Sequence, residues 1–294
     1  MAGTTTQIQP TTHTLEAPGA TITYDIRRSD STTKPILMLI GSPMGAGGFP
    51  TLASHFPDRT IVTYDPRGAD RSTKADPATE SSPEQHADDI SRVIAAVTDQ
   101  PIDLFASSGG AVNALALVAR HPEQVRLVVA HEPPLASQLP DREAAKAVVR
   151  AVADTYQRSG WGAGMAHFIA ATSHKGEFPV GFADQPAPDP AMFGLPAQDD
   201  GSRHDVMLEQ NIINTTHYEP DYDALRRAST KIVIAVGEES EGEMARRGGE
   251  AVAAKLGTTP VVFPSGHGGF LGGEYGQSGK PDQFAAKLRQ VLDS

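Results

Sequence analysis

The sequence predicts an α/β protein built on a mostly parallel, doubly wound sheet of about eight strands. Short apolar runs alternate with amphipathic helical stretches along most of the 294-residue chain. Several of these runs are continuous, as in strands that are buried on both faces of a parallel sheet. The alternation stops over residues 135–228, where helical patterns surround a proline-rich loop. We therefore expect an α/β core of residues 1–134 plus 229–294, with residues 135–228 inserted as a helical cap.

The N-terminal part of the chain is expected to supply three strands and a helix. Residues 1 to about 10 resemble a loose tail. Residues 21–27 alternate apolar and polar side chains, which is typical of an exposed antiparallel edge strand. Residues 35–40 and 60–64 are apolar enough to be central strands. A serine followed by proline and glutamate predicts the start of a helix over 83–97.

The next stretch is the one around which the chain is organised. A buried strand over about 102–107 is followed by a tight turn and by an apolar helix over 111–119. Ser108 lies at the apex of this turn, where its hydroxyl stands clear of the sheet. Ala106 and Gly110 are both small, as the close approach of strand and helix requires. The N-terminus of the helix lies behind Ser108, so its free N–H groups favour developing negative charge.

The predicted cap follows a strand over 126–130. Helical patterns cover about 141–158, 161–173 and 203–215, and a loop over 185–200 with four prolines is the expected mobile lid. Large apolar side chains in this segment are expected to pack in the core or the lid, and some of them to line a substrate pocket: Trp161, Phe168, Phe178, Phe182, Met192, Phe193, Met207 and Tyr218.

The strand–helix alternation then resumes to the end of the chain. Residues 231–237 and 260–263 are expected strands, and helices are expected over about 241–256 and 281–292. His267 stands in a glycine-rich turn after the last strand.

Composition excludes several classes of partner. The formal net charge is -11 and no basic run occurs, which argues against binding to nucleic acid or an anionic membrane. No apolar stretch approaches the roughly 20 residues of a membrane span. The polar N-terminus lacks the pattern of a signal peptide, so we expect a cytoplasmic protein. The sequence indicates nothing about oligomeric state.

Metal and cofactor motifs are not evident. The chain has no cysteine, and its ten histidines show no metal-binding spacing such as H-E-x-x-H. The glycines at 45, 47 and 48 do not fit G-x-G-x-x-G, and residues 273–280 fail the P-loop pattern. We therefore expect no metal and no cofactor.

Four stretches at the ends of expected strands resemble motifs of the α/β-hydrolase superfamily, in its capped esterase, haloperoxidase and dehalogenase-like branch. They are residues 40–43, 65–72, 106–110 and 265–267. The sequence departs from the usual motifs at Ile40, where a histidine is common, and at Asp70 and Ala106, where glycines are usual. The resemblance covers nearly the whole chain outside the cap.

The resemblance implies a serine hydrolase without a cofactor. Ser108 would be the nucleophile and His267 the base that takes its proton. The backbone N–H groups of Ser42 and Gly109 would form the oxyanion hole. The expected reaction is cleavage of an ester, thioester or lactone of a small, fairly apolar substrate through an acyl-enzyme.

The acidic member of the triad is not settled by the motif. Its usual position, three residues after the glycine that ends the penultimate strand, holds Ser240. Some relatives instead place a glutamate at the end of the preceding strand, which corresponds to Glu132. We favour Glu132, with Glu239 as the alternative.

Two other functional hypotheses stay open. The same triad supports perhydrolysis, hydrolysis of a C–C bond or cyclisation, which fold and triad do not distinguish. The serine at the missing acid position and Ile40 also allow a ligand-binding protein that keeps the fold without catalysis.

Overall fold

The computed structural model describes residues 9–29 and 33–294 of the chain. Its strands form one nine-stranded sheet in the order β1-β2-β4-β3-β6-β7-β8-β9, with β5 paired to β2. Neighbouring strands in the part β4-β3-β6-β7-β8-β9 of this order are parallel. The pairs β1–β2, β2–β4 and β2–β5 are antiparallel. The strand bounds are β1 Thr11–Ala17, β2 Ala20–Arg27, β3 Leu37–Ile40, β4 Ile61–Tyr64, β5 Thr73–Lys74, β6 Ile102–Ser107, β7 Val125–His131, β8 Lys231–Gly237 and β9 Val261–Phe263. The predicted fold class is confirmed.

The prediction of an exposed edge strand at 21–27 is wrong. These residues belong to β2, which lies inside the sheet between β1 and β4 and is largely buried. Thr12 Oγ1 of β1 donates to Asp25 Oδ1 at 2.6 Å, and Thr23 Oγ1 donates to the carbonyl oxygen of Arg71 at 3.1 Å. Thr23 and Asp25 of the alternating pattern are therefore buried and bonded within the protein instead of facing water. The tail predicted over residues 1–10 lies mostly outside the described residues.

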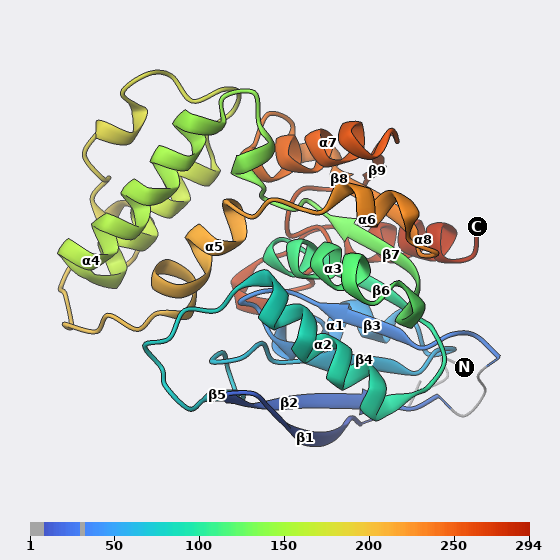
Figure 1. The fold of residues 1–294 in the computed structure, drawn as a ribbon. Coiled ribbons are helices and arrows are strands. Elements are labelled where there is room, and N and C mark those ends of the chain that lie inside the picture. The colour runs from blue at the N-terminus through green and yellow to red at the C-terminus, as the bar shows by residue number, and fades with distance from the viewer. Residues whose placement is uncertain (1–8, 30–32) are drawn as a thin grey trace, which may run out of the picture.

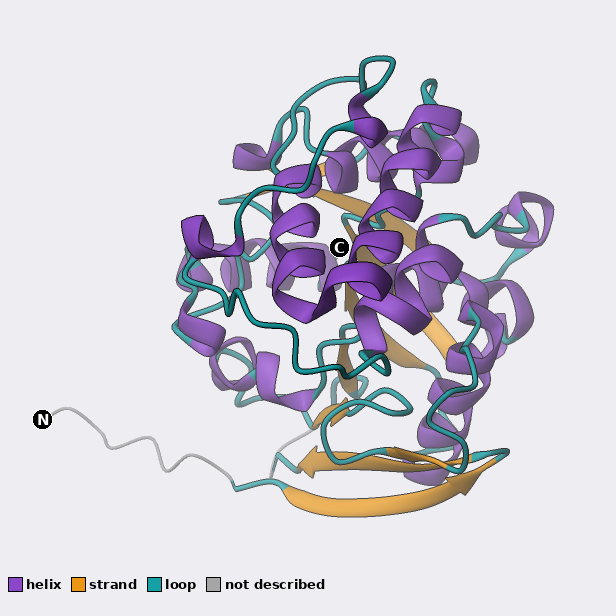
Figure 2. Cartoon of the chain, turned by 90° about the vertical axis from the view of Figure 1, so that its left-hand side faces the viewer, coloured by secondary structure: helices purple, strands orange, loops and turns teal. Residues whose placement is uncertain are grey.

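Helices cover both faces of the sheet (Figures 1 and 2). One face packs against α2 Pro83–Val97, α3 Gly109–Arg120, α6 Tyr222–Arg227 and α7 Met244–Leu256, and the other against α1 Pro50–Ser54 and α8 Pro281–Leu292. Each face has an apolar core that its helices share with alternate strand residues. The start of α2 is the predicted one, because Ser82 and Gln85 form a reciprocal capping box. The start of α7 is later than predicted, because Gly242 has a φ of 83° and Glu243 forms an isolated β-bridge with Lys175.

The segment between β7 and β8 contains helices and no named strand, and α4 and α5 stand to one side of the sheet (Figure 1). Its main helix, α4 Arg142–Thr172, is broken at Gly160, where φ is 83° and ψ is -177°. The break separates the two helices that the sequence predicts. The third predicted helix starts later than expected: residues 203–205 are not helical, and a π-helical turn, Val206–Asn211, leads into α5 Ile212–Thr216.

Among the described residues, no helix has both the length and the apolar character needed to cross a lipid bilayer.

Candidate active site

Ser108 is the residue between the end of β6 and the start of α3. Its φ of 58° and ψ of -128° are strained for a residue with a side chain, and its N–H donates to the carbonyl oxygen of His131 at 2.9 Å. A Cβ atom on Gly110 would approach the backbone of Gly41 to 2.8 Å, so the turn tolerates only glycine there. The turn therefore has the tight geometry predicted for it and directs Ser108 into a cavity.

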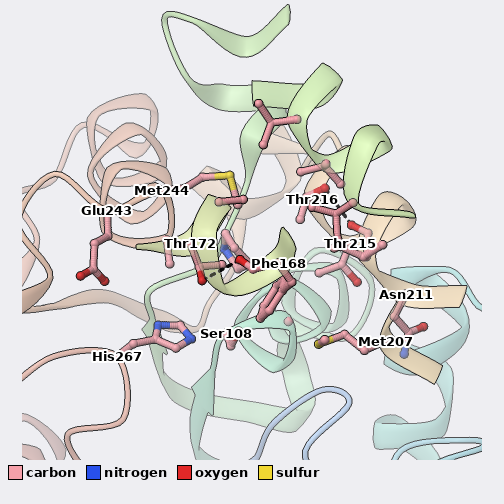
Figure 3. Close-up of a pocket in the computed structure, with 18 of the residues that line it drawn as sticks. Ser108, Phe168, Thr172, Met207, Asn211, Thr215, Thr216, Glu243, Met244 and His267 are labelled. Carbon is pink, nitrogen blue, oxygen red and sulfur yellow. Dashed lines mark hydrogen bonds between the residues drawn. The ribbon is translucent and has the colours of Figure 1, made fainter. Parts of the chain in front are cut away.

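His267 lies in the turn after β9 and lines the same cavity as Ser108. Its Nδ1 is 2.6 Å from Oε2 of Glu132. Because an ionised carboxylate only accepts hydrogen bonds, Nδ1 carries the proton and Nε2 is left as an acceptor. The imidazole points toward Ser108 (Figure 3). The structure thus brings together Ser108, His267 and Glu132.

Glu132 immediately follows β7 and is completely buried. It has a φ of 48°, and its Oε1 accepts a hydrogen bond of 2.8 Å from the N–H of Gly237. Burial by itself would raise its pKa, but the hydrogen bond from His267, the two neighbouring histidines and the Gly237 N–H lower the pKa to about 2. The side chain is therefore an anion held against His267 over the whole physiological pH range.

Glu239 occupies a different environment. Its Oε2 accepts a hydrogen bond from Ser265 Oγ at 3.1 Å, and its Oε1 pairs with Lys280 at 2.7 Å. Its side chain is half exposed and has no hydrogen bond to His267. Of the two glutamates left open by the sequence, Glu132 is the one that the fold places against the histidine.

Ser240 stands where the superfamily usually has its acid. It is buried, and its Oγ has no hydrogen-bond partner. A Cβ atom on Gly237 would lie 2.9 Å from that oxygen and 2.7 Å from the carbonyl oxygen of Ser265. The turns after β8 and β9 therefore touch through glycine, which leaves no room for a larger side chain at the end of β8.

The two residues predicted to form an oxyanion hole also meet at the cavity. Ser42 and Gly109 both line it, and the carbonyl oxygen of Ser42 is 2.6 Å from the position of a Cβ atom on Gly109. Gly109 is the first residue of α3, so its N–H has no acceptor within the helix.

The stretch over residues 65–72 contacts the turn that follows β3 and contains Ser42. Asp65 is buried and accepts hydrogen bonds from Ala46 N at 2.9 Å and Arg71 Nε at 2.6 Å. Asp70, which replaces the usual glycine, has a φ of 47°. The position therefore keeps the left-handed conformation that favours glycine and that aspartate tolerates better than most residues.

The cavity beside Ser108 has a volume of about 260 Å³ and a largely apolar lining (Figure 3). Of the large apolar residues considered from the sequence, Phe168 and Met207 line it, whereas Phe178 packs in the core of the helical segment and Met192 is exposed. Both halves of α4 contribute to the lining, with Val148, Val149 and Val152 before the break and Phe168, Ala171 and Thr172 after it.

Several polar residues of the cavity escaped sequence reasoning, and two of them, Glu243 and Asn211, carry a carboxyl or an amide group. Glu243, near His267, has a pKa raised by burial and by the negative charge of Glu132. Asn211 lies on the side of the cavity away from His267 (Figure 3). Neither residue belongs to a motif, so no sequence signal distinguishes it from other polar residues of the segment.

His131 is a buried neighbour of the site and does not line the cavity. Its Nδ1 is 3.1 Å from Ser107 Oγ, and burial lowers its pKa to about 4. Arg67 and Arg126, which could have paired with Glu132, bind Asp89 and Asp103 instead. Within residues 9–29 and 33–294, no three His, Asp or Glu side chains are grouped as ligands of a metal ion.

Comparison with known proteins agrees with this fold. Residues 34–179 match the family model described as alpha/beta hydrolase fold. Over 132 residues the chain is 42% identical to the uncharacterized hydrolase YraK of Bacillus subtilis (strain 168), which is 44% of this chain and 47% of YraK. The match thus spans about half the length of that relative.

Two solved structures share the fold over almost their whole length. MGS-M2, an alpha/beta hydrolase enzyme from a Medee basin deep-sea metagenome library, has a TM-score of 0.69 and 12% identity, with 96% of this chain and 98% of that chain covered. A thermophilic esterase from Thermogutta terrifontis has a TM-score of 0.65 and 19% identity, with coverages of 97% and 98%. Sheet order, family model and relatives agree, and the chain belongs to the α/β-hydrolase superfamily.

Proposed function

We propose that the protein is a serine hydrolase that cleaves an ester, thioester or lactone of a small, fairly apolar substrate. The observation that carries the proposal is the 2.6 Å hydrogen bond from His267 to the buried Glu132, beside Ser108 in one cavity. A serine hydroxyl needs such an oriented base to become a nucleophile. The esterase of Thermogutta terrifontis, whose fold is similar, supports the same class of reaction.

In the first half of the proposed reaction, Ser108 Oγ attacks the carbonyl carbon of the substrate while His267 Nε2 takes the hydroxyl proton. The Oγ–C bond forms and the carbonyl oxygen becomes an oxyanion, which the backbone N–H groups of Gly109 and Ser42 stabilise. The bond to the leaving group then breaks, and His267 protonates the departing alcohol or thiol. Glu132 holds the imidazole tautomer and stabilises its protonated form.

In the second half, water replaces the leaving group. His267 takes a proton from the water, and the new C–O bond forms at the acyl carbon. The Oγ–C bond then breaks, and His267 returns its proton to Ser108. The products are a carboxylic acid and the free enzyme.

The substrate class follows from the cavity. Residues 135–228 are proposed to act as a cap, because α4, the π-helical turn and α5 supply most of the wall opposite Ser108. A volume of about 260 Å³ suits a small acyl group and not a polymer. The valines, Phe168 and Met207 favour a mainly hydrocarbon chain.

The first experiment is intact-mass measurement after reaction with a fluorophosphonate, combined with hydrolysis of short p-nitrophenyl esters. We expect one adduct and ester hydrolysis with the natural protein, and neither with Ser108→Ala. The matched control is Ser107→Ala, which removes the adjacent hydroxyl that bonds to His131 and is not in the cavity lining. This control should still acquire the adduct.

Two results would contradict the proposal. A folded natural protein that neither reacts with the probe nor hydrolyses any ester would favour the ligand-binding alternative. Labelling at Ser108 without hydrolysis of any ester, thioester or lactone would instead favour perhydrolysis, C–C bond hydrolysis or cyclisation on the same three residues.

A further inference from the structure

Asn211 is a buried polar residue in a largely apolar cavity, and one of its polar atoms is unpartnered. It ends the π-helical turn Val206–Asn211, and the residue is 3% exposed. Its Nδ2 makes no hydrogen bond, although a buried amide donor without an acceptor is costly. Thr172 and Thr216, which line the same cavity, donate their hydroxyls to helix carbonyls. Nδ2 of Asn211 is therefore a free donor at the wall of the cavity.

His86 of α2 determines which end of the amide is free. Its Nε2 is 3.3 Å from Oδ1 of Asn211, and its Nδ1 has no partner. Burial lowers the pKa of His86 to about 4, so the ring is neutral and carries one proton. With that proton on Nε2, His86 donates a hydrogen bond to Oδ1 of Asn211, and its Nδ1 is left as a buried acceptor without a donor. The opposite tautomer would bury an N–H donor without an acceptor, which is less favourable.

The charged residues of the cavity lining limit which chemical groups of a substrate could accept a hydrogen bond from Nδ2 of Asn211. None of the described residues lining the cavity is a lysine or an arginine, and Glu243 at the His267 side is acidic. A carboxylate or phosphate in the substrate would find no cation there. A neutral acceptor oxygen, such as that of a ketone, suits one amide donor in an apolar wall.

We propose that Asn211 Nδ2 donates a hydrogen bond to a neutral oxygen on the acyl chain of the substrate. The cavity then selects acyl chains with a keto or similar oxygen, remote from the reacting carbonyl, over plain hydrocarbon chains. His86 acts as a positioning residue that orients the amide. This inference rests on the proposed hydrolase function, because it assigns the cavity to the acyl group.

The test compares matched pairs of p-nitrophenyl esters. The esters of 4-oxopentanoic, 5-oxohexanoic and 6-oxoheptanoic acids are each measured against the ester of the plain acid of equal length. The readout is the ratio of the two kcat/KM values in each pair. The variants are Asn211→Leu, which removes the donor at similar size, and Thr216→Val, which removes a hydroxyl that is already bonded to Ile212 O.

We expect the natural protein to prefer the keto ester by about tenfold or more in at least one pair. This ratio should fall to about one in Asn211→Leu and persist in Thr216→Val. A ratio near one in all three pairs for the natural protein overturns the proposal without any variant, so a misfolded variant does not decide the result. A ratio that Asn211→Leu leaves unchanged also overturns it.

A binding arm separates failure of this inference from failure of the hydrolase function. The p-nitroanilides of the same acids are titrated calorimetrically into Ser108→Ala, with and without Asn211→Leu. One outcome is that no ester is hydrolysed, but Ser108→Ala binds the keto anilide about tenfold more tightly than its plain counterpart and loses this preference with Asn211→Leu. This outcome would support the Asn211 subsite and contradict the hydrolase function. If neither binding nor hydrolysis distinguishes the pairs, the subsite is wrong.

Discussion

At the scale of single residues, the candidate site concentrates unusual backbone conformations. Ser108, Glu132 and Ser265 have φ values of 58°, 48° and 68°, although none of them is glycine. Each such conformation costs on the order of 1–3 kcal/mol, so the surrounding contacts must stabilise it. The three residues place the proposed nucleophile, the carboxylate and the turn of His267 at the same edge of the sheet.

The two glutamates provide the sharpest test at this scale. Glu132→Gln keeps the size of the side chain but removes the charge that holds the tautomer of His267. We expect kcat for a p-nitrophenyl ester to fall by about 10³- to 10⁴-fold. Glu239→Gln changes an exposed pair with Lys280, and kcat should stay within about threefold of the natural value. The reverse order of effects in steady-state kinetics would show that the carboxylate acts from the other turn.

At the scale of elements, the break in α4 shapes the cavity. Both halves of the helix line it, and a straight helix of the same length would direct one half away from Ser108. Gly160 makes the break possible, because its φ of 83° with ψ of -177° lies in a region that is nearly restricted to glycine. A Cβ atom there would also come within 2.4 Å of Asp199 Oδ1.

Replacement of this glycine should therefore destabilise the protein. We expect Gly160→Ala to lower the free energy of unfolding by about 3 kcal/mol, measured by urea denaturation. Gly194 is the matched control, because its φ of 68° and ψ of 21° are left-handed and a Cβ atom there would meet open space. Gly194→Ala should therefore lower the free energy of unfolding by only about 1 kcal/mol. Equal losses in the two variants would mean that the break imposes no special requirement.

At the scale of the whole molecule, buried histidines link stability to pH, and the pKa values of His86 and His131 show the link most clearly. Burial lowers the pKa of His86 and His131 from 6.5 to about 4 in the folded protein. The unfolded chain therefore binds more protons than the folded one between these values, and stability decreases as the pH falls through this window. The loss amounts to up to about 3 kcal/mol for each histidine. Glu132, with a pKa of about 2, adds a further loss only below pH 4.5.

This dependence is measurable by urea denaturation between pH 7.5 and pH 5. We expect the free energy of unfolding to decrease steadily over this range. His131→Phe, which places a ring among Phe105, Phe263 and Phe284, should make the slope shallower. If the free energy of unfolding of the natural protein does not change between pH 7.5 and pH 5, burial does not lower the pKa of these histidines.

Local patterns were sufficient for most of the fold. Continuous apolar runs predict the parallel strands, and small residues around Ser108 predict the tight turn, because both depend on neighbours within a few residues. The edge of the sheet was predicted wrongly. The polar residues of β2 are bonded to Arg71 and Thr12, which are distant in the sequence or belong to a strand that the pattern did not indicate.

The sequence by itself determined the fold class. It also placed the serine turn and the histidine turn at the ends of strands, at one edge of the sheet. Only the tertiary structure placed Glu132, and not Glu239, against His267, since that contact joins residues 135 positions apart through the pairing of β7 with β8 and β8 with β9. The lining of the cavity was likewise decided by packing. Asn211 reaches it because the π-helical turn packs against α4 while Asn211 itself contacts His86 of α2, and no local periodicity encodes contacts between separate elements.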